Sequence, residues 1–87
     1  MSALGKTIRR KRKSIKVTLE GLHKMTGISK GYLCDIENGR HGDISFGVIV
    51  VIANMLGISI VRLQNAYLHD TFPDVYPEYL DIDAPTL

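Results

Sequence analysis

Several residue types that mark other classes of protein are scarce or absent in this chain. It has no tryptophan and a single cysteine, Cys34, so a disulfide within the chain is excluded and a reducing compartment is expected. Its longest apolar run, residues 48–53, is far shorter than the roughly 18 residues of a membrane span. No long apolar stretch follows the basic N-terminus, which argues against a signal peptide. We therefore expect a cytoplasmic protein with no membrane partner.

The charged residues are distributed unevenly along the chain. All eleven Lys and Arg residues lie within residues 1–67 together with four acids, which gives that part a charge of +7. Residues 68–87 contain five acids and neither Lys nor Arg. This asymmetry fits a basic body that faces nucleic acid, and it fits equally a solvated basic surface followed by a loose acidic tail.

Apolar spacing and helix-boundary residues predict an all-α fold, a compact five-helix bundle in a single domain. Hydroxyl side chains stand where N-caps are needed, and glycines stand where the backbone turns left-handed to end a helix. The helices are expected at about residues 3–13, 19–26, 30–38, 46–56 and 60–67. The predicted N-caps are Thr18, Ser29, Ser45 and Ser59, and the predicted stops are Gly27, Gly39 and Gly57.

Two regions follow from this pattern, a helix-turn-helix domain at residues 1–67 and an acidic, apolar-studded tail at residues 68–87. Three prolines in the tail exclude a long helix there. Its aromatic and aliphatic residues favour an extended or short-helical arm that docks on a surface, with free disorder as the alternative. Such an arm would serve dimerisation or bind a protein partner.

Residues 19–38 have the layout of a helix-turn-helix, with Gly27 at the turn. The joint spacing over about residues 4–67 resembles the Cro and phage-repressor family, also called Xre-type. The residues that carry the resemblance are Leu4-Gly5, Ile8-Arg9, Arg12, Leu22, Thr26-Gly27-Ile28-Ser29, Tyr32-Leu33, Ile36-Glu37-Asn38-Gly39, Ser45, Ile52-Ala53 and Leu56-Gly57-Ile58-Ser59.

The resemblance implies a five-helix bundle that binds operator DNA, usually as a dimer. Arg12 and Glu37 match the ion pair that joins the first helix to the recognition helix in this family. The chain departs from the family pattern at Leu19, where a phosphate-contacting Gln is usual. It departs again at His23, where a small Ala is usual.

The recognition helix is expected to send Leu33 and Ile36 inward, leaving one face for double-stranded DNA. Lys30 is the best candidate base reader, because Lys donates to guanine O6 and N7. Asp35 is expected either to accept from a cytosine amino group or to stay a solvated acid. The predicted DNA-facing residues are Ser29, Lys30, Gly31, Cys34, Asp35, Asn38, Arg40 and His41. Among them, the predicted phosphate contacts are Ser29, Asn38, Arg40 and His41. Cys34 is interpreted as a small residue that fits near the groove.

The fourth helix is apolar on nearly every side, which is unusual for a surface helix. An uncovered apolar face on a small domain indicates contact with a second subunit, or with the tail of the same chain folded back over it. The predicted dimer interface consists of Val48, Val51, Met55, Val61 and Tyr67.

No set of residues indicates catalysis or a cofactor. The three histidines, His23, His41 and His69, match no metal-ligand spacing. We therefore predict a regulator that uses no metal or cofactor and is not an enzyme. It is expected to act as a dimer on a near-palindromic operator in a bacterium or phage, with repression as the default mechanism. The alternative is a protein-interaction module of the same fold, an antitoxin or an adaptor.

Overall fold

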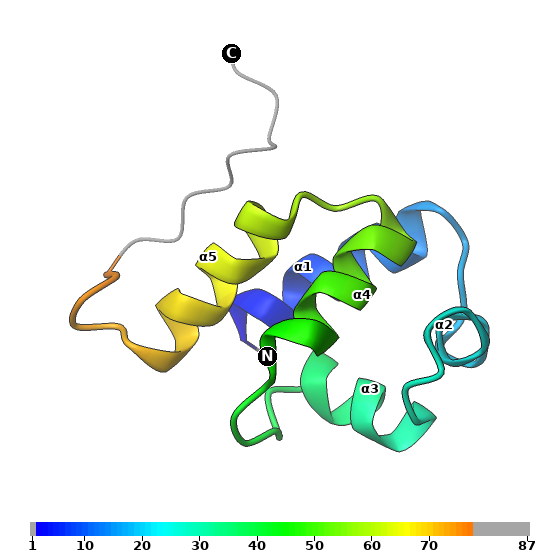
Figure 1. The fold of residues 1–87 in the computed structure, drawn as a ribbon, viewed down its shortest axis with the longest axis horizontal. Coiled ribbons are helices and arrows are strands. Elements are labelled where there is room, and N and C mark those ends of the chain that lie inside the picture. The colour runs from blue at the N-terminus through cyan, green and yellow to red at the C-terminus, as the bar shows by residue number, and fades with distance from the viewer. Residues whose placement is uncertain (1, 78–87) are drawn as a thin grey trace, which may run out of the picture.

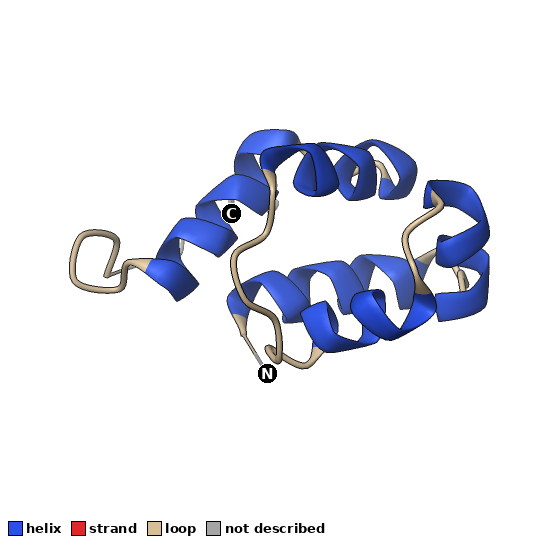
Figure 2. Cartoon of the chain, turned by 60° about the horizontal axis from the view of Figure 1, so that its bottom comes forward, coloured by secondary structure: helices blue, strands red, loops and turns tan. Residues whose placement is uncertain are grey.

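The computed structural model describes residues 2–77. Helices and loops make up this part of the chain, and no strand occurs within it (Figures 1 and 2). The predicted all-α, five-helix fold class is confirmed. The helices are α1 (Ala3–Ser14), α2 (Leu19–Thr26), α3 (Lys30–Glu37), α4 (Phe46–Leu56) and α5 (Ile60–Thr71).

The predicted helix boundaries are confirmed at their caps. Each capping hydroxyl accepts the backbone N–H three residues later, as when Thr18 Oγ1 accepts from Gly21 N at 2.9 Å. The same bond occurs at Ser29, Ser45 and Ser59. Gly27, with φ 77°, adopts the left-handed conformation that ends α2. Local hydroxyl signals therefore set where α2, α3, α4 and α5 begin, and glycines set where α2 and α4 end.

The core is enclosed by all five helices, with α1 packing on α5 and α3, and α4 packing on α5 and α2. Its largest fully buried side chains are aliphatic and come from all five helices. Helix α1 crosses α3 at Gly5, where an added Cβ would lie 2.2 Å from the Glu37 carbonyl oxygen. Only glycine allows so close an approach. The fully buried aliphatic side chains of the core are Leu4, Ile8, Leu22, Leu33, Ile36, Ile49, Ile52, Leu56 and Leu63.

Helix α5 is longer than predicted, because it continues to Thr71 instead of ending near Tyr67. Proline 73 sets the true end, since the residue before a proline is disfavoured in the helical conformation, and Phe72 has φ −128° and ψ 64°. Residues 68–71, which the sequence analysis placed in the tail, are thus helical. A turn follows at residues 73–75. The rest of the predicted tail, residues 78–87, lies outside the described residues.

Candidate nucleic-acid interface

The turn between α2 and α3 is held by side chains of α2. The Thr26 hydroxyl donates to the Leu22 carbonyl at 2.8 Å and accepts from Ile28 N at 3.1 Å. His23 Nδ1 lies 2.7 Å from the Ile28 carbonyl oxygen, so this nitrogen carries a proton and donates. His23, which departs from the family pattern, therefore clamps the turn that positions α3.

Helix α3 is two-sided in the way the sequence predicts. Leu33 and Ile36 are each 1% exposed and belong to the core. On the opposite face Ser29, Lys30 and Gly31 are exposed, while Cys34 and Asp35 are half-buried. An α-helix with its side chains is about 10–12 Å in diameter, which fits a DNA major groove about 12 Å wide. This face is therefore free to enter a groove.

A buried ion pair braces α3 against α1. Arg12 donates from Nε to Glu37 Oε2 at 2.7 Å and from Nη2 to Glu37 Oε1 at 3.0 Å. Its Nη1 donates to the Val17 carbonyl at 3.0 Å, so one guanidinium links α1, the connector between α1 and α2, and α3. The hydrogen bond to Glu37 raises the pKa of Arg12 against the opposing effect of burial, so Arg12 stays cationic at neutral pH.

The two candidate base readers each have a charged neighbour within the chain. Lys30 Nζ lies 4.0 Å from Glu20 Oε2, and Asp35 Oδ1 accepts from Arg40 Nη2 at 3.3 Å. All four side chains are at least 45% exposed, and exposed pairs of this kind contribute about 0–1 kcal/mol. Both pairs are weak enough to exchange for contacts with a nucleic acid.

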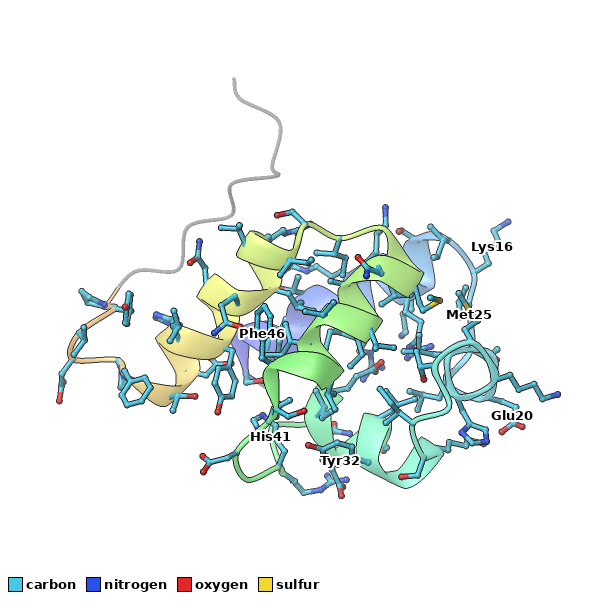
Figure 3. All side chains as sticks on the ribbon, viewed as in Figure 1. Lys16, Glu20, Met25, Tyr32, His41 and Phe46 are labelled. Atoms are coloured by element: carbon cyan, nitrogen blue, oxygen red, sulfur yellow. The ribbon has the colours of Figure 1, made fainter. Side chains whose placement is uncertain are left out.

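The predicted phosphate-contacting residues other than Ser29 lie at the end of α3 and in the loop that follows it. The Asn38 amide donates to the Cys34 carbonyl at 2.8 Å and thus caps α3. His41 Nδ1 donates to the Gly42 carbonyl at 2.7 Å, and Figure 3 places His41 beside the α3–α4 loop, along the edge that also carries Tyr32. The buried Ile44 fixes the far end of the loop, where its N–H donates to the Tyr67 hydroxyl at 3.4 Å.

The positive charge is concentrated on α1 and not on α2, α3 or the loop after them. Residues 3–17 carry seven Lys or Arg and no acid. Residues 19–43 carry three basic residues, Lys24, Lys30 and Arg40, against four acids, one of which is the buried partner of Arg12. The recognition face is thus close to neutral, and the strongest positive field comes from α1.

Apolar side chains remain exposed on α4 and α5. Met55 is 43% exposed and Val61 is 55% exposed, whereas Val48 and Tyr67 pack partly against the core of the same chain. Val51 is half-buried. Phe46, at the start of α4 beside α5, is 61% exposed (Figure 3). Residues 68–77 therefore leave much of this surface open.

Two kinds of site do not occur within residues 2–77. No helix there combines the length and the apolar character required to cross a bilayer. No three His, Cys, Asp or Glu side chains of this stretch come together as metal ligands would.

Three positioning contacts were missed by the sequence analysis. Ser2 caps α1, with its Oγ accepting from Gly5 N at 2.9 Å. Asp70 accepts from Ala3 N and Leu4 N, both at 2.9 Å, so the end of α5 holds the start of α1. The third contact is the His23 clamp. Only Ser2 had a local signal, a hydroxyl residue directly before a helix; the others join residues whose proximity depends on the fold.

The comparisons with known proteins agree with this geometry. A helix-turn-helix family model matches residues 8–63, which is more than half of the chain. No curated protein and no solved structure was found to match it. The matched residues include the Arg12–Glu37 brace, the turn at Gly27 and the outward face of α3. The chain belongs to the Xre-type helix-turn-helix family of DNA-binding transcription regulators.

Proposed function

We propose that this chain is a cytoplasmic, sequence-specific repressor that binds a near-palindromic operator as a dimer. The observation that carries the proposal is the sidedness of α3, whose Leu33 and Ile36 are buried while Ser29, Lys30 and Gly31 are exposed. A helix presented in this way has the dimensions to enter the major groove. Binding over a promoter would repress transcription by excluding polymerase.

Each exposed residue has a distinct proposed role. Lys30 leaves Glu20 and donates to guanine, while Asp35 accepts from a cytosine amino group after Arg40 turns to a phosphate. Gly31 and Cys34 are small and allow the helix to approach the bases. The phosphate contacts come from Ser29, Asn38, Arg40 and His41, and they supply affinity and register but no base choice.

The spacing of the DNA grooves is the reason for proposing a dimer. Two recognition helices reach successive major grooves when their centres are about 34 Å apart on one face of the duplex. The proposed contact surface includes the exposed Met55 and Val61, with Val48, Val51 and Tyr67 at its edge. The division into a DNA-binding domain at 1–67 and an arm at 68–87 that aids dimerisation stays part of this proposal.

Selection of bound fragments from random DNA tests the proposal. We expect a two-fold symmetric consensus, since a symmetric dimer presents the same α3 face to both half-sites. Enrichment of an asymmetric half-site alone would contradict the dimer. No enrichment at all would contradict sequence-specific binding.

A second candidate, a protein-interaction module such as an antitoxin or adaptor, is favoured by the near-neutral recognition face. There the acids Glu20 and Asp35 pair with Lys30 and Arg40. The dependence of DNA affinity on salt separates the two functions. A repressor loses affinity steeply as salt rises, because each phosphate contact releases counterions. Weak DNA binding at every salt concentration would favour the protein partner.

A further inference from the structure

Helix α1 presents an unpartnered row of cations to solvent. We call it the α1 stripe, and it consists of Lys6, Arg9, Arg10 and Lys13. These four side chains line one shallow pocket of about 260 Å³. Lys6, Arg10 and Lys13 are exposed and Arg9 is half-buried, and among the ion pairs of residues 2–77 none involves the stripe. Four neighbouring cations without a counter-charge repel one another, so an anionic partner would stabilise this face.

The acid that shares a pocket with part of the stripe, Asp70, already has hydrogen-bond partners. Asp70 shares a pocket of about 420 Å³ with Lys6 and Arg10. Both of its carboxylate oxygens accept backbone N–H groups, from Ala3 and Leu4. Asp70 therefore holds the end of α5 against the start of α1, and the cationic side chains beside it keep their donors available.

The chain leaves α5 next to this pocket. His69 Nδ1 donates to the Tyr76 carbonyl at 2.9 Å, and the His69 side chain lines the same pocket as Lys6 and Arg10. The backbone at Tyr76 is thus fixed near the N-terminal end of the α1 stripe. The next acids of the sequence are Glu78, Asp81 and Asp83, and no Lys or Arg accompanies them.

We infer that the acidic segment Glu78–Asp83 docks on the α1 stripe of its own chain. An extended chain from residue 77 to residue 83 spans about 20 Å, whereas the stripe from Lys6 to Lys13 is about 10 Å long. The carboxylates can therefore reach the whole stripe. The short tether raises their effective concentration to the millimolar range, which favours the contact within one chain over contacts between chains.

This contact gives the acidic segment a regulatory role that rests on the proposed DNA binding. The α1 stripe is the strongest source of positive field, because residues 19–43 carry three basic against four acidic residues. Carboxylates bound there reduce the attraction of the protein for phosphates. The segment then competes with DNA phosphates for the α1 stripe. It therefore weakens non-specific DNA binding more than it weakens binding through base contacts.

The docking itself is tested without DNA, by NMR of the full chain at low salt. The side-chain N–H resonances of Arg9 and Arg10 are compared between the parent and D81N/D83N. The matched control is D43N/D74N, which removes two exposed acids outside the proposed contact. We expect D81N/D83N to shift both arginine resonances and D43N/D74N to leave them unchanged. At high salt we expect the arginine resonances of the parent to move toward those of D81N/D83N, because the Debye length falls to about 3 Å at 1 M.

Equal spectra of the parent and D81N/D83N would overturn the inference, as would shifts that depend on protein concentration, which would place the contact between chains. The second measurement is affinity for random DNA, where we expect a severalfold gain for D81N/D83N over D43N/D74N at low salt. Because the NMR measurement contains no DNA, failure of docking and failure of DNA binding are distinguishable.

Discussion

Arg12 and Glu37 form a two-pronged, buried ion pair that joins the first helix to the recognition helix. Their closest atoms, Nε and Oε2, lie 2.7 Å apart, and the side chains are 11% and 3% exposed. Since Arg12 also donates to the Val17 carbonyl, the pair fixes the connector that leads into α2. The angle at which α3 leaves the body of the protein therefore depends on this contact.

Breaking this pair should be costly. In Glu37→Ala a buried guanidinium loses its counter-charge, and we expect the free energy of unfolding to fall by about 3–5 kcal/mol, measured by urea denaturation. The double variant Arg12→Met, Glu37→Leu removes both charges and should lose less than Glu37→Ala alone. A larger loss in the double variant would contradict a desolvated pair.

Two glycines should respond in opposite directions to the same substitution. In Gly5→Ala the new methyl meets the Glu37 backbone, so we expect a loss of about 1–3 kcal/mol or more from overpacking. In Gly31→Ala nothing lies within 4 Å, so the helix should gain about 0.5–1 kcal/mol. The same Gly31→Ala protein should bind DNA more weakly if α3 approaches the bases closely. Thermal or urea unfolding of both variants checks the signs, and a destabilised Gly31→Ala would contradict the open face.

Asp70 should contribute to stability although it lies in the acidic C-terminal part of the sequence. Asp70→Ala removes the acceptor of two N–H groups at the positive end of α1, so we expect a loss of about 1–2 kcal/mol. Asp74→Ala, which changes an exposed acid on the following turn, should stay within about 0.5 kcal/mol of the parent. Equal effects of the two substitutions would show that the cap is not formed in solution.

Two methionines with the same 43% exposure test the dimer surface. Met55→Asp places a charge on the proposed interface and should shift the protein toward monomer, because a buried unpaired charge is costly. Met25→Asp changes an equally exposed residue on α2, which is not part of the proposed interface, and should leave the mass unchanged. Sedimentation equilibrium measures both; an unchanged dimer in Met55→Asp would place the interface elsewhere.

The sequence was sufficient to predict the helices, and to predict which face of α3 is buried and which is exposed, because these features depend on local signals. Hydroxyl caps at Thr18 and Ser29, the turn at Gly27 and the spacing of Leu33 and Ile36 all act within a few residues. The predicted end of α5 near Tyr67 is too early, because the change in charge at residue 68 does not coincide with the end of the helix at Thr71.

Contacts between distant segments were less accessible to sequence reasoning. The family resemblance implied the Arg12–Glu37 pair. Nothing in the sequence pattern brings Asp70 to the start of α1, and the link is made only when α5 packs along α1. The Glu20–Lys30 neighbour pair likewise depends on how α2 and α3 cross. The weak net charge of the recognition face also depends on the fold, because Glu37, one of the four acids in residues 19–43, is buried against Arg12.

The most direct test of a DNA-reading α3 is the affinity of Lys30→Ala for its selected operator and for random DNA, measured at the same salt concentration. We expect a loss of roughly 1–3 kcal/mol on the operator and a much smaller loss on random DNA, because a base contact is lost only at the specific site. Lys24→Ala, an exposed lysine on α2, provides the control and should weaken both by similar amounts. Equal losses on operator and random DNA in Lys30→Ala would contradict base reading by this helix.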